Sequence, residues 1–260
     1  MQQPQDTATI ALLGSLLLAQ VACAAAPAGE VARTKASSKS TLADLVETAK
    51  ERRLRAGFLI VDGVYNTELT APYDVLEHTL YHAPNDLGIE VFTVSPEGMA
   101  VTTAEGLRIQ ADYSFANVPA IDVLIVPSTE SSRDKDLEDE DLIEWVAGTG
   151  ESAGAVMSLC WGAFVLAQAG LLDESACTTF PRDYDTFSRR FPGLDLRINV
   201  SFVHSGKNIT SQGGARSFDA AMYLVDKLYG EQVAAGIGGG LLIPWPPSAG
   251  SAPYLVSEPK

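Results

Sequence analysis

The sequence has few cysteines and histidines, the residues that most often stabilise a small fold through disulfides or a bound metal. It contains three of each among 260 residues. The cysteines, Cys23, Cys160 and Cys177, stand too far apart to form a Cys-x-x-Cys pair of the zinc-binding kind. Three cysteines also cannot build the disulfide framework of a small secreted domain. We therefore expect a fold that is held by an apolar core, without a structural metal.

Positive charge is scarce as well. Lys and Arg number 18 against 33 Asp and Glu, which gives a net charge of −15 at pH 7. Phosphate backbones and anionic lipid surfaces repel such a chain, so nucleic acid is not an expected partner. Hydrophobic residues make up 46% of the sequence. This content is enough for a globular core and excludes a fully disordered protein.

The one long apolar run near the start of the chain, residues 10–26, is typical of a signal peptide. It is shorter than the roughly 20 apolar residues that span a membrane, and its small final residues suit a signal peptidase. The stretch that ends at Cys23 also resembles a degraded lipobox, which would make Cys23 a lipid anchor. The first nine residues carry Asp6 but no Lys or Arg. An exported protein, either periplasmic or membrane-anchored, is expected, and a cytoplasmic protein with an apolar tail is the alternative.

The chain divides into four parts by composition. Residues 1–29 form the signal peptide or lipoprotein leader, and residues 30–53 form a polar spacer that leads into a short helix. Residues 54–245 carry the patterns of one α/β domain, and residues 246–260 form a Pro-rich, flexible tail.

Strand patterns alternate with helical patterns along the domain. Runs such as AVMSL are unbroken apolar stretches, typical of strands that are covered on both faces. This alternation predicts an α/β fold with a mostly parallel sheet between helices. Ligands of such folds bind at the carboxyl ends of the strands. We expect strands over 56–61, 89–94, 107–113, 121–126 and 155–159, helices over 42–53, 69–80, 142–146, 161–169 and 218–228, and a hairpin-like pair over 197–203 and 208–211.

Cys160 directly follows the predicted strand 155–159 and precedes a helix that starts with Trp161-Gly162-Ala163. This arrangement is typical of a nucleophile elbow, in which Gly162 and Ala163 allow a sharp turn to pack closely. Free N–H groups at the helix start would stabilise a thiolate and make Cys160 nucleophilic at neutral pH. The alternative is a buried structural cysteine. A disulfide between Cys160 and Cys177 would silence the thiol, so an active enzyme requires Cys177 to be buried apart from it.

Five motifs occur in the order seen in the DJ-1/PfpI superfamily. They are Asp62-Gly63, the segment ELTAPYDV that begins at Glu68, the strand DVLIVP at 122–127, the elbow LCWGA around Cys160, and TSQGG at 210–214. The chain resembles this superfamily over residues 55–235, and most of all its branch of isocyanide hydratase and of the amidase-like domains of AraC-type regulators. The resemblance implies a flavodoxin-like three-layer sandwich, similar to class I glutamine amidotransferase domains, and a homodimer.

The resemblance also implies roles for single residues. Cys160 matches the elbow nucleophile, and Glu68 matches the acidic residue that hydrogen-bonds its sulfur. A carboxyl group beside a thiolate favours its protonated form, which can donate that bond and later act as a general acid. The oxyanion site of the family uses backbone N–H groups, which correspond here to those of Trp161 and of Thr129 in the Ser128-Thr129 loop.

Two features depart from the family pattern. Phe180 stands where many relatives have a histidine near the cysteine, and Ser128 and Thr129 replace two glycines of the oxyanion loop. Ser128, Phe180 and Gly162 are expected to line the pocket, and Tyr184 either roofs it or packs in the core. Both departures disfavour a hydrolase or protease. Hydration of a small electrophile is affected less, because a thiolate and a proton donor suffice for it.

The favoured interpretation is a cysteine-dependent enzyme that resembles isocyanide hydratase. It would add the Cys160 thiolate to an electrophilic carbon of a small molecule and then hydrate the adduct, with no metal or organic cofactor. The alternative is a non-catalytic binding or redox-sensing domain in which Cys160 is oxidised rather than turned over. The ligand domain of a transcription regulator is disfavoured, because residues 240–260 are too few for a DNA-binding helix pair.

The histidines and the longest acidic run are expected to play no part in the chemistry. His78 and His82 would share a helix face but have no evident third metal ligand, so they are expected at the surface. His204, at the hairpin turn, could approach a neighbouring site in a dimer. Residues 134–141, with the sequence DKDLEDED, fit a solvated helix start better than a calcium loop, which needs a Gly and a terminal Glu that are missing here.

Overall fold

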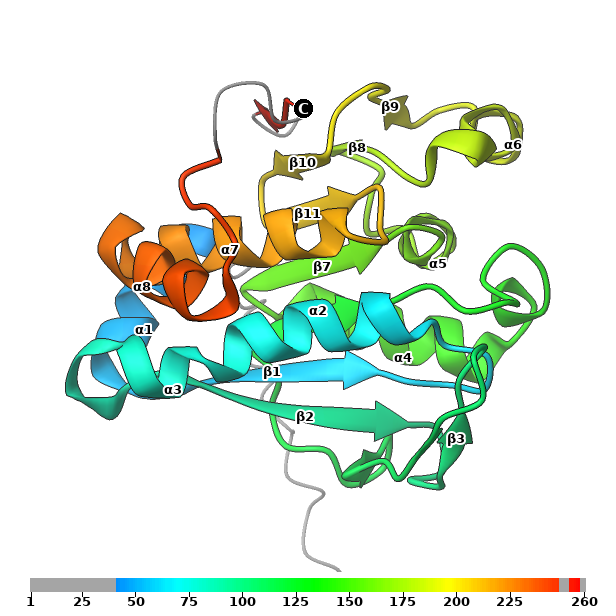
Figure 1. Ribbon diagram of the computed structural model, residues 1–260. Coiled ribbons are helices and arrows are strands. Elements are labelled where there is room, and N and C mark those ends of the chain that lie inside the picture. The colour runs from blue at the N-terminus through cyan, green and yellow to red at the C-terminus, as the bar shows by residue number, and fades with distance from the viewer. Residues whose placement is uncertain (1–40, 248–252, 258–260) are drawn as a thin grey trace, which may run out of the picture. The chain divides into compact units, whose positions relative to one another are not determined.

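An eight-stranded sheet runs through the part of the chain that the computed structural model describes, residues 41–247 and 253–257. Its strand order is β12-β10-β11-β7-β6-β1-β2-β5 (Figure 1). All neighbouring strands are parallel except β10 and β11, which form an antiparallel hairpin. The strands of this sheet are β1 Leu54–Leu59, β2 Ile89–Ser95, β5 Tyr113–Ser114, β6 Val123–Val126, β7 Ala155–Leu159, β10 Phe202–Ser205, β11 Asn208–Ser211 and β12 Leu255–Ser257.

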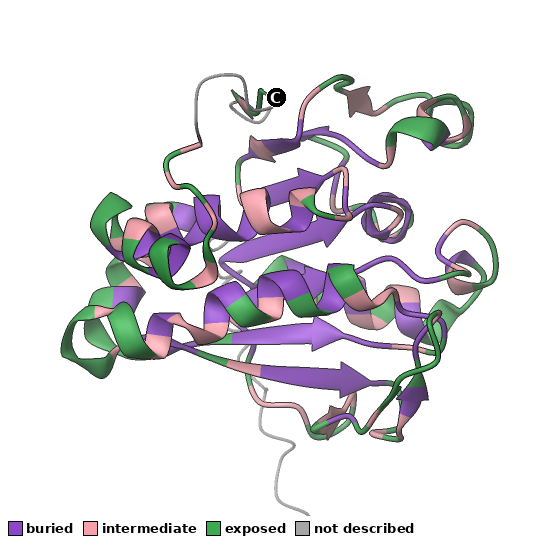
Figure 2. Ribbon diagram, in the orientation of Figure 1, coloured by how far each residue is buried: buried purple, intermediate pink, exposed green. Residues whose placement is uncertain are grey.

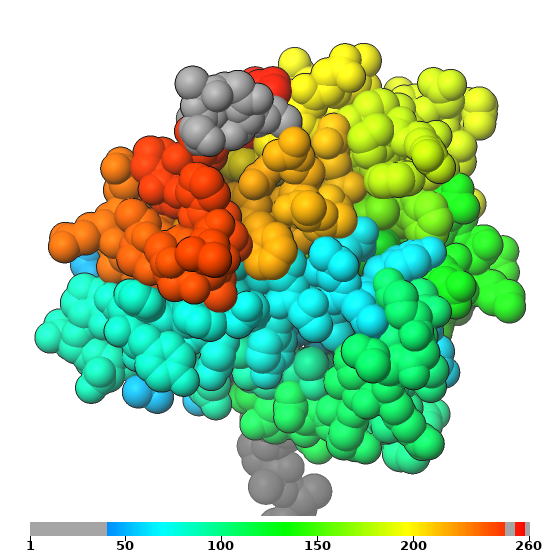
Figure 3. Space-filling view, in the orientation of Figure 1, coloured from blue at the N-terminus to red at the C-terminus, as the bar shows by residue number. Residues whose placement is uncertain are grey.

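Helices cover both faces of the sheet. One layer contains α1, α2, α7 and α8, and α2 packs along α7 on the face seen in Figure 3. The other layer contains α4, α5 and α6. Single 3-10 turns follow α3 and precede α4 and α6. The helices are α1 Leu42–Glu51, α2 Asn66–Glu77, α3 Thr79–His82, α4 Glu140–Ser152, α5 Gly162–Gln168, α6 Tyr184–Arg190, α7 Arg216–Tyr229 and α8 Glu231–Leu241.

Successive residues of the central strands point into two different cores. In β6, Val123 and Ile125 lie in the core beneath α2 and α7, whereas Leu124 and Val126 lie in the core beneath α4 and α5. Side chains alternate between the faces of a strand, so a strand covered on both faces is apolar throughout. Figure 2 shows the central strands buried along their length. The predicted α/β, flavodoxin-like three-layer sandwich with a mostly parallel sheet is confirmed.

The largest departure from the predicted elements lies between β2 and β6. The strand expected over 107–113 is divided between β4, Arg108–Ile109, and β5 at the sheet edge. β4 pairs antiparallel with β3, Val101–Thr102. Gly106, with a φ of +89°, lies in the turn that joins them. A second small pair is formed by β8, Ala176–Cys177, and β9, Asp195–Leu196.

Packed structure extends beyond both ends of the predicted domain, 54–245. The expected short helix is α1, which begins with a capping box in which Thr41 accepts the Asp44 N–H at 3.2 Å. Leu45 and Ala49 of this helix are buried in the core beneath α7. At the other end, β12 pairs parallel with β10, so part of the tail expected over 246–260 belongs to the sheet.

The predicted leader, residues 1–29, lies outside the described residues, and so does its candidate anchor Cys23. Among the described residues, no helix combines the length and the apolar character that crossing a membrane would require.

Four strand ends meet at one edge of the sheet. The parallel strands β1, β6, β7 and β11 are neighbours. Their carboxyl ends lead to α2 with Glu68, to Ser128, to Cys160 and to Gly213 respectively. Residues from four distant parts of the sequence therefore converge at the edge where ligands of parallel α/β folds bind.

Candidate active site

Cys160 occupies a sharp turn between β7 and α5, where the nucleophile elbow was predicted. Its φ of +54° lies in the left-handed region that non-glycine residues seldom adopt. Its N–H donates to the carbonyl oxygen of Ser211 at 2.9 Å, and its own carbonyl oxygen accepts the Thr179 hydroxyl at 2.8 Å. Such strain persists where neighbouring segments hold the backbone, and it concentrates at functional sites.

Gly162, the first residue of α5, brings the elbow against the end of β6. A Cβ atom here would lie 2.1 Å from the carbonyl oxygen of Val126 and 3.3 Å from that of Pro127. Both atoms belong to the backbone, so they cannot rotate away. The close packing expected of Gly162 is present, and it places Ser128, the next residue of the β6 loop, beside the cysteine turn.

Glu68 provides a buried carboxyl group, only 6% exposed, in the first turn of α2. Its Oε2 atom accepts the backbone N–H of Ser128 at 3.2 Å and also accepts the Ser128 hydroxyl. Its Oε1 atom accepts the N–H of Gly214 at 3.2 Å. These donors come from the loops after β6 and β11, and they fix the direction in which the carboxyl group points.

The Cys160 thiol lies among three hydrogen-bonding groups. They are the Glu68 carboxyl group, the Ser128 hydroxyl and the backbone N–H of Trp161. Gly213 packs closely against two of these residues. A Cβ atom at Gly213 would lie 2.3 Å from the Cβ atom of Cys160 and 2.7 Å from Oε1 of Glu68. The structure thus brings Cys160, Glu68, Ser128 and Trp161 together in one buried cluster.

The surroundings of Cys160 oppose ionisation of its thiol. Burial raises the pKa of Cys160 above its ordinary value of 9.0, and the negative charge of Glu68 raises it further. Hydrogen bonds from the Ser128 hydroxyl and the Trp161 N–H lower this pKa by less. Burial therefore acts against the effect expected of the start of α5, and a thiolate at neutral pH stays a prediction. A base must remove the proton, and Glu68 is in contact with it.

The two backbone donors predicted for an oxyanion site are both engaged. The N–H of Trp161 is directed at the sulfur of Cys160. The N–H of Thr129 donates to Oγ of Ser132 at 2.8 Å, and the Thr129 hydroxyl donates to Asp136. An oxyanion role for Trp161 or Thr129 stays a prediction, and for Thr129 it requires that the bond to Ser132 be exchanged for one to the ligand.

Aromatic rings surround the elbow. The ring centroid of Trp161 lies 5.9 Å from that of Tyr65 and 6.2 Å from that of Phe180, both in edge contact. The indole N–H of Trp161 donates to Asp183 at 2.7 Å, and the Arg133 guanidinium stacks over the ring at 4.0 Å. Arg133 also pairs with Asp183 at 2.6 Å. These five residues form what we call the aromatic rim, and its one cation is neutralised by its own carboxylate.

Parts of this site were missed in the sequence. The glycines 213–214 stand one residue after the predicted strand 208–211, and that position is the signal by which their close approach to the cysteine could have been found. The pair of Arg133 and Asp183 gave no local signal, since its members are 50 residues apart. Tyr184 accepts a hydrogen bond from the Gln212 amide at 2.9 Å, which places its hydroxyl beside the turn at 213–214.

The other cysteine and the histidines have surroundings of their own. Cys160 and Cys177 are both unpaired and buried, so no disulfide joins them. His78 bonds within its own helix, and His204 contacts the Tyr223 hydroxyl at 2.8 Å. Among residues 41–247 and 253–257, no group of three or more His, Cys, Asp or Glu side chains is arranged to hold a metal ion.

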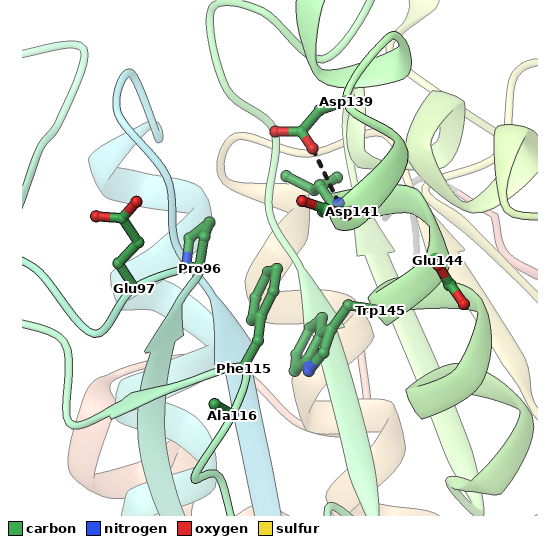
Figure 4. Close-up of a pocket in the computed structure, with 9 residues that line it drawn as sticks. Pro96, Glu97, Phe115, Ala116, Asp139, Asp141, Glu144 and Trp145 are labelled. Carbon is green, nitrogen blue, oxygen red and sulfur yellow. Dashed lines mark hydrogen bonds between the residues drawn. The ribbon is translucent and has the colours of Figure 1, made fainter.

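An open groove of about 610 Å³ lies at the start of α4, away from Cys160. The rings of Phe115 and Trp145 stack in it at 4.2 Å (Figure 4). Asp139, from the acidic run 134–141, caps α4 by accepting the Leu142 N–H at 3.0 Å, in line with the predicted helix start. The lining contains none of the groups around the thiol. It consists of Pro96, Glu97, Phe115, Ala116, Asp139, Asp141, Leu142, Glu144 and Trp145.

Comparison with known proteins gives consistent matches over the described domain. The profile of the DJ-1/PfpI family matches residues 54–227. An isonitrile hydratase of Pseudomonas putida is 30% identical over 182 residues, which cover 70% of this chain and 75% of that protein. The HTH-type transcriptional regulator GbdR of Pseudomonas aeruginosa is 27% identical over 182 residues, but these cover only 48% of its length. The crystal structure of Drosophila melanogaster DJ-1beta superposes with a TM-score of 0.64 at 21% identity, over 74% of this chain and all of that one.

Proposed function

The chain belongs to the DJ-1/PfpI family, and from that premise we propose that it is a cysteine-dependent hydratase of small electrophiles such as isonitriles. One observation carries the proposal: the thiol of Cys160 lies in a strained, buried turn with the Glu68 carboxyl group in hydrogen-bonding contact. This arrangement supplies a nucleophile and a proton carrier without a metal. The isonitrile hydratase of Pseudomonas putida, similar to this chain over most of its length, supports the choice of substrate class.

The chemistry follows from the positions of the two groups. The proton of the Cys160 thiol passes to the Glu68 carboxylate, and the resulting thiolate attacks the terminal carbon of the isonitrile. Glu68 then gives its proton to that carbon, which leaves a thioimidate on the sulfur. Water adds its hydroxyl to the carbon while the C–S bond breaks, and the nitrogen and the sulfur end with one proton each. The sum is one isonitrile and one water converted to one N-substituted formamide.

The surroundings of the thiol favour a neutral substrate. A pair of charges need not be created in the apolar site, because the proton moves between two groups that share one negative charge. The aromatic rim offers ring faces and edges, and the charge of Arg133 is already matched by Asp183. A small, uncharged electrophile therefore fits the approach to Cys160 better than an ionic one.

Turnover of isonitriles by the purified full chain tests this function. The expected product is the N-substituted formamide, followed by chromatography over a panel of small aliphatic and aromatic isonitriles. We expect Cys160→Ser and Glu68→Gln to abolish product formation, whereas Cys177→Ala, a matched change at the other buried cysteine, keeps it. Equal rates in the wild type and in Cys160→Ser would contradict the proposal.

A redox-sensing role has less support from the structure. Sensor cysteines are exposed and have a low pKa, because oxidation follows thiolate character. Cys160 is 6% exposed and has a raised pKa. This role would require Cys160 to form a stable sulfenic acid at low peroxide without any turnover of isonitriles.

We further propose a homodimer and an exported protein, as the family resemblance and the apolar run at residues 10–26 led us to expect. Light scattering on the purified full chain tests the dimer, and a monomer at micromolar concentration would contradict it. The mature N-terminus, read by mass spectrometry after expression in a bacterial host, separates cleavage before residue 30 from lipidation at Cys23. An intact N-terminus would contradict both.

A further inference from the structure

The hydroxyl of Ser128 contacts both members of the reacting pair. Its oxygen lies within hydrogen-bonding distance of Oε2 of Glu68, and the hydroxyl is among the groups whose hydrogen bonds shift the pKa of the Cys160 thiol. Ser128 is fully buried, and its backbone N–H is fixed on the same carboxylate at 3.2 Å. The side chain therefore stands in one place between the two groups, where a glycine would supply the backbone contact alone.

A hydroxyl has one proton, so it can donate only one hydrogen bond at a time and must accept the other. It can donate to the Glu68 carboxylate while it accepts from the Cys160 thiol, or it can donate to the Cys160 thiolate while it accepts from a protonated Glu68. The two arrangements contain the same atoms and differ only in where two protons lie. A shift of both protons along one line converts the first arrangement into the second.

We propose that the Ser128 hydroxyl relays the proton between Cys160 and Glu68, which makes Ser128 a catalytic residue of this chain. The S–H bond breaks as its proton passes to Oγ of Ser128, and the Ser128 O–H bond breaks as its proton passes to Oε2 of Glu68. Serine ends unchanged, the sulfur holds the negative charge, and the carboxyl group is neutral. The role rests on the proposed site of Cys160 and Glu68.

The Ser128 hydroxyl stabilises the second arrangement, which contains the Cys160 thiolate, for a physical reason. In both arrangements the hydroxyl donates one bond to an anion, so that strong bond is kept. The bond that the hydroxyl accepts changes from one donated by a thiol, a weak donor, to one donated by a carboxylic acid, a strong donor. Removal of the hydroxyl therefore costs the thiolate form more than the thiol form.

Few other titratable groups face the relay. Burial raises the pKa of Tyr65, and the charges of Glu130, of Cys160 and Glu68 themselves, and of Glu105 raise it further, so this tyrosine stays neutral across the physiological range. In the aromatic rim, Asp183 and Arg133 neutralise each other. Among the groups that shift the pKa of Cys160, Glu68 is the charged one.

The pH dependence of Cys160 alkylation tests the relay without a substrate. The full chain is treated with iodoacetamide from neutral to alkaline pH, and mass spectrometry of the Cys160 peptide gives the rate. A thiolate made by transfer to Glu68 needs no hydroxide, so the wild type should show a component of the rate that is independent of pH. We expect Ser128→Ala and Ser128→Gly to lower this component about ten-fold, Glu68→Gln to remove it, and Ser128→Thr to keep it.

Ser158→Ala is the matched control, because Ser158 is a fully buried serine of β7 whose hydroxyl has no hydrogen-bond partner. It should leave the profile unchanged. A pH-independent component that survives in both Ser128→Ala and Ser128→Gly would overturn the relay and leave the hydratase proposal standing. The relay is equally overturned if wild-type Cys160 reacts only in proportion to hydroxide. Should the variants behave as expected while no isonitrile is hydrated, the relay stands and the proposed substrate class fails.

Discussion

The two cysteines in the described part of the chain differ in their surroundings rather than in their burial. Both are buried and unpaired, and burial raises the pKa of both. Cys177 lies in the short strand β8, and the one charge that shifts its pKa is that of Asp195. Cys160 lies in a left-handed turn, in hydrogen-bonding contact with a carboxyl group, a hydroxyl and a backbone N–H.

This difference shows what makes a buried thiol usable. A thiol in apolar surroundings keeps its proton, because an isolated anion there is costly. A carboxylate in contact with it changes the balance, since the proton can move to the carboxylate without any change in the total charge of the site. Cys177 has no such acceptor within hydrogen-bonding contact in the described structure, so we expect it to be inert.

Replacing Gly213 should produce the largest effect, because this residue lies against both Cys160 and Glu68 and leaves no room for a side chain. A Cβ atom there would overlap Cys160 and Glu68, and the φ of +82° adds backbone strain. We expect Gly213→Ala to lower isonitrile turnover at least about 100-fold and to reduce the free energy of unfolding by about 2–4 kcal/mol. Steady-state kinetics and denaturant titration measure the two effects.

Gly230→Ala is the control for backbone strain alone. Its φ is +89°, but a Cβ atom at Gly230 would meet nothing within 4 Å. We expect a loss of about 1–3 kcal/mol and unchanged turnover. Equal loss of activity in Gly213→Ala and Gly230→Ala would break the claim that the close approach of Gly213 is what matters.

Alkaline pH should weaken the fold through Cys177. Its pKa is raised from the ordinary value of 9.0 to about 12 in the folded protein, so the folded state holds this proton more tightly than the unfolded state. The stabilisation is complete below pH 9 and is lost as the pH rises toward 12, by about 1.4 kcal/mol per pH unit at most. Thermal melts over this range should therefore fall less steeply for Cys177→Ala than for the wild type. Parallel curves would show that the burial of Cys177 does not set its pKa.

Removal of a charge from the aromatic rim should have a moderate effect. Asp183→Asn leaves Arg133 without its carboxylate and weakens the bond from the Trp161 indole. We expect KM for an isonitrile to rise a few-fold with little change in kcat, and a loss of about 1–2 kcal/mol in the free energy of unfolding. Asp185→Asn, at an exposed neighbour in α6, should change neither. A fall in kcat at constant KM would place Asp183 in the reaction itself.

The smallest effect is expected at a glycine inside α4. Gly148 lies in α4, and a Cβ atom there would meet nothing within 4 Å. Alanine in a helix interior is more favourable than glycine, so Gly148→Ala should raise the free energy of unfolding by about 0.5–1 kcal/mol. Chemical denaturation measures this gain, and a loss would show that space around a glycine is a poor guide to substitution in this fold.

The sequence was a good guide to the layers and to the position of the elbow. The unbroken apolar runs of β6 and β7 predicted strands buried on both faces, and Cys160 stands at the predicted turn. The segment 107–113 differs from the prediction because its apolar pattern spans two short strands, β4 and β5, which pair with different neighbours, β3 and β2. Burial depends on tertiary packing, which composition does not show, and for this reason the sequence does not predict the raised pKa of Cys160.

Contacts between distant segments explain the remaining gaps. Ser128 was expected in the pocket as a replacement for glycine, but nothing local shows that its hydroxyl would reach both Glu68 and Cys160. These groups follow three different strands, and the register of a parallel sheet decides which of their atoms meet. The pair of Arg133 and Asp183 was missed for the same reason.

Covalent capture on the sulfur tests the central claim most directly. The full chain is mixed with an isonitrile, quenched in acid within the first turnovers and digested, and the peptides are weighed. The account predicts a peptide that contains Cys160 and has gained the mass of one isonitrile, with no such gain on the peptide that contains Cys177. Formamide production by a chain whose Cys160 never carries the adduct, or that has Ser at position 160, would contradict it.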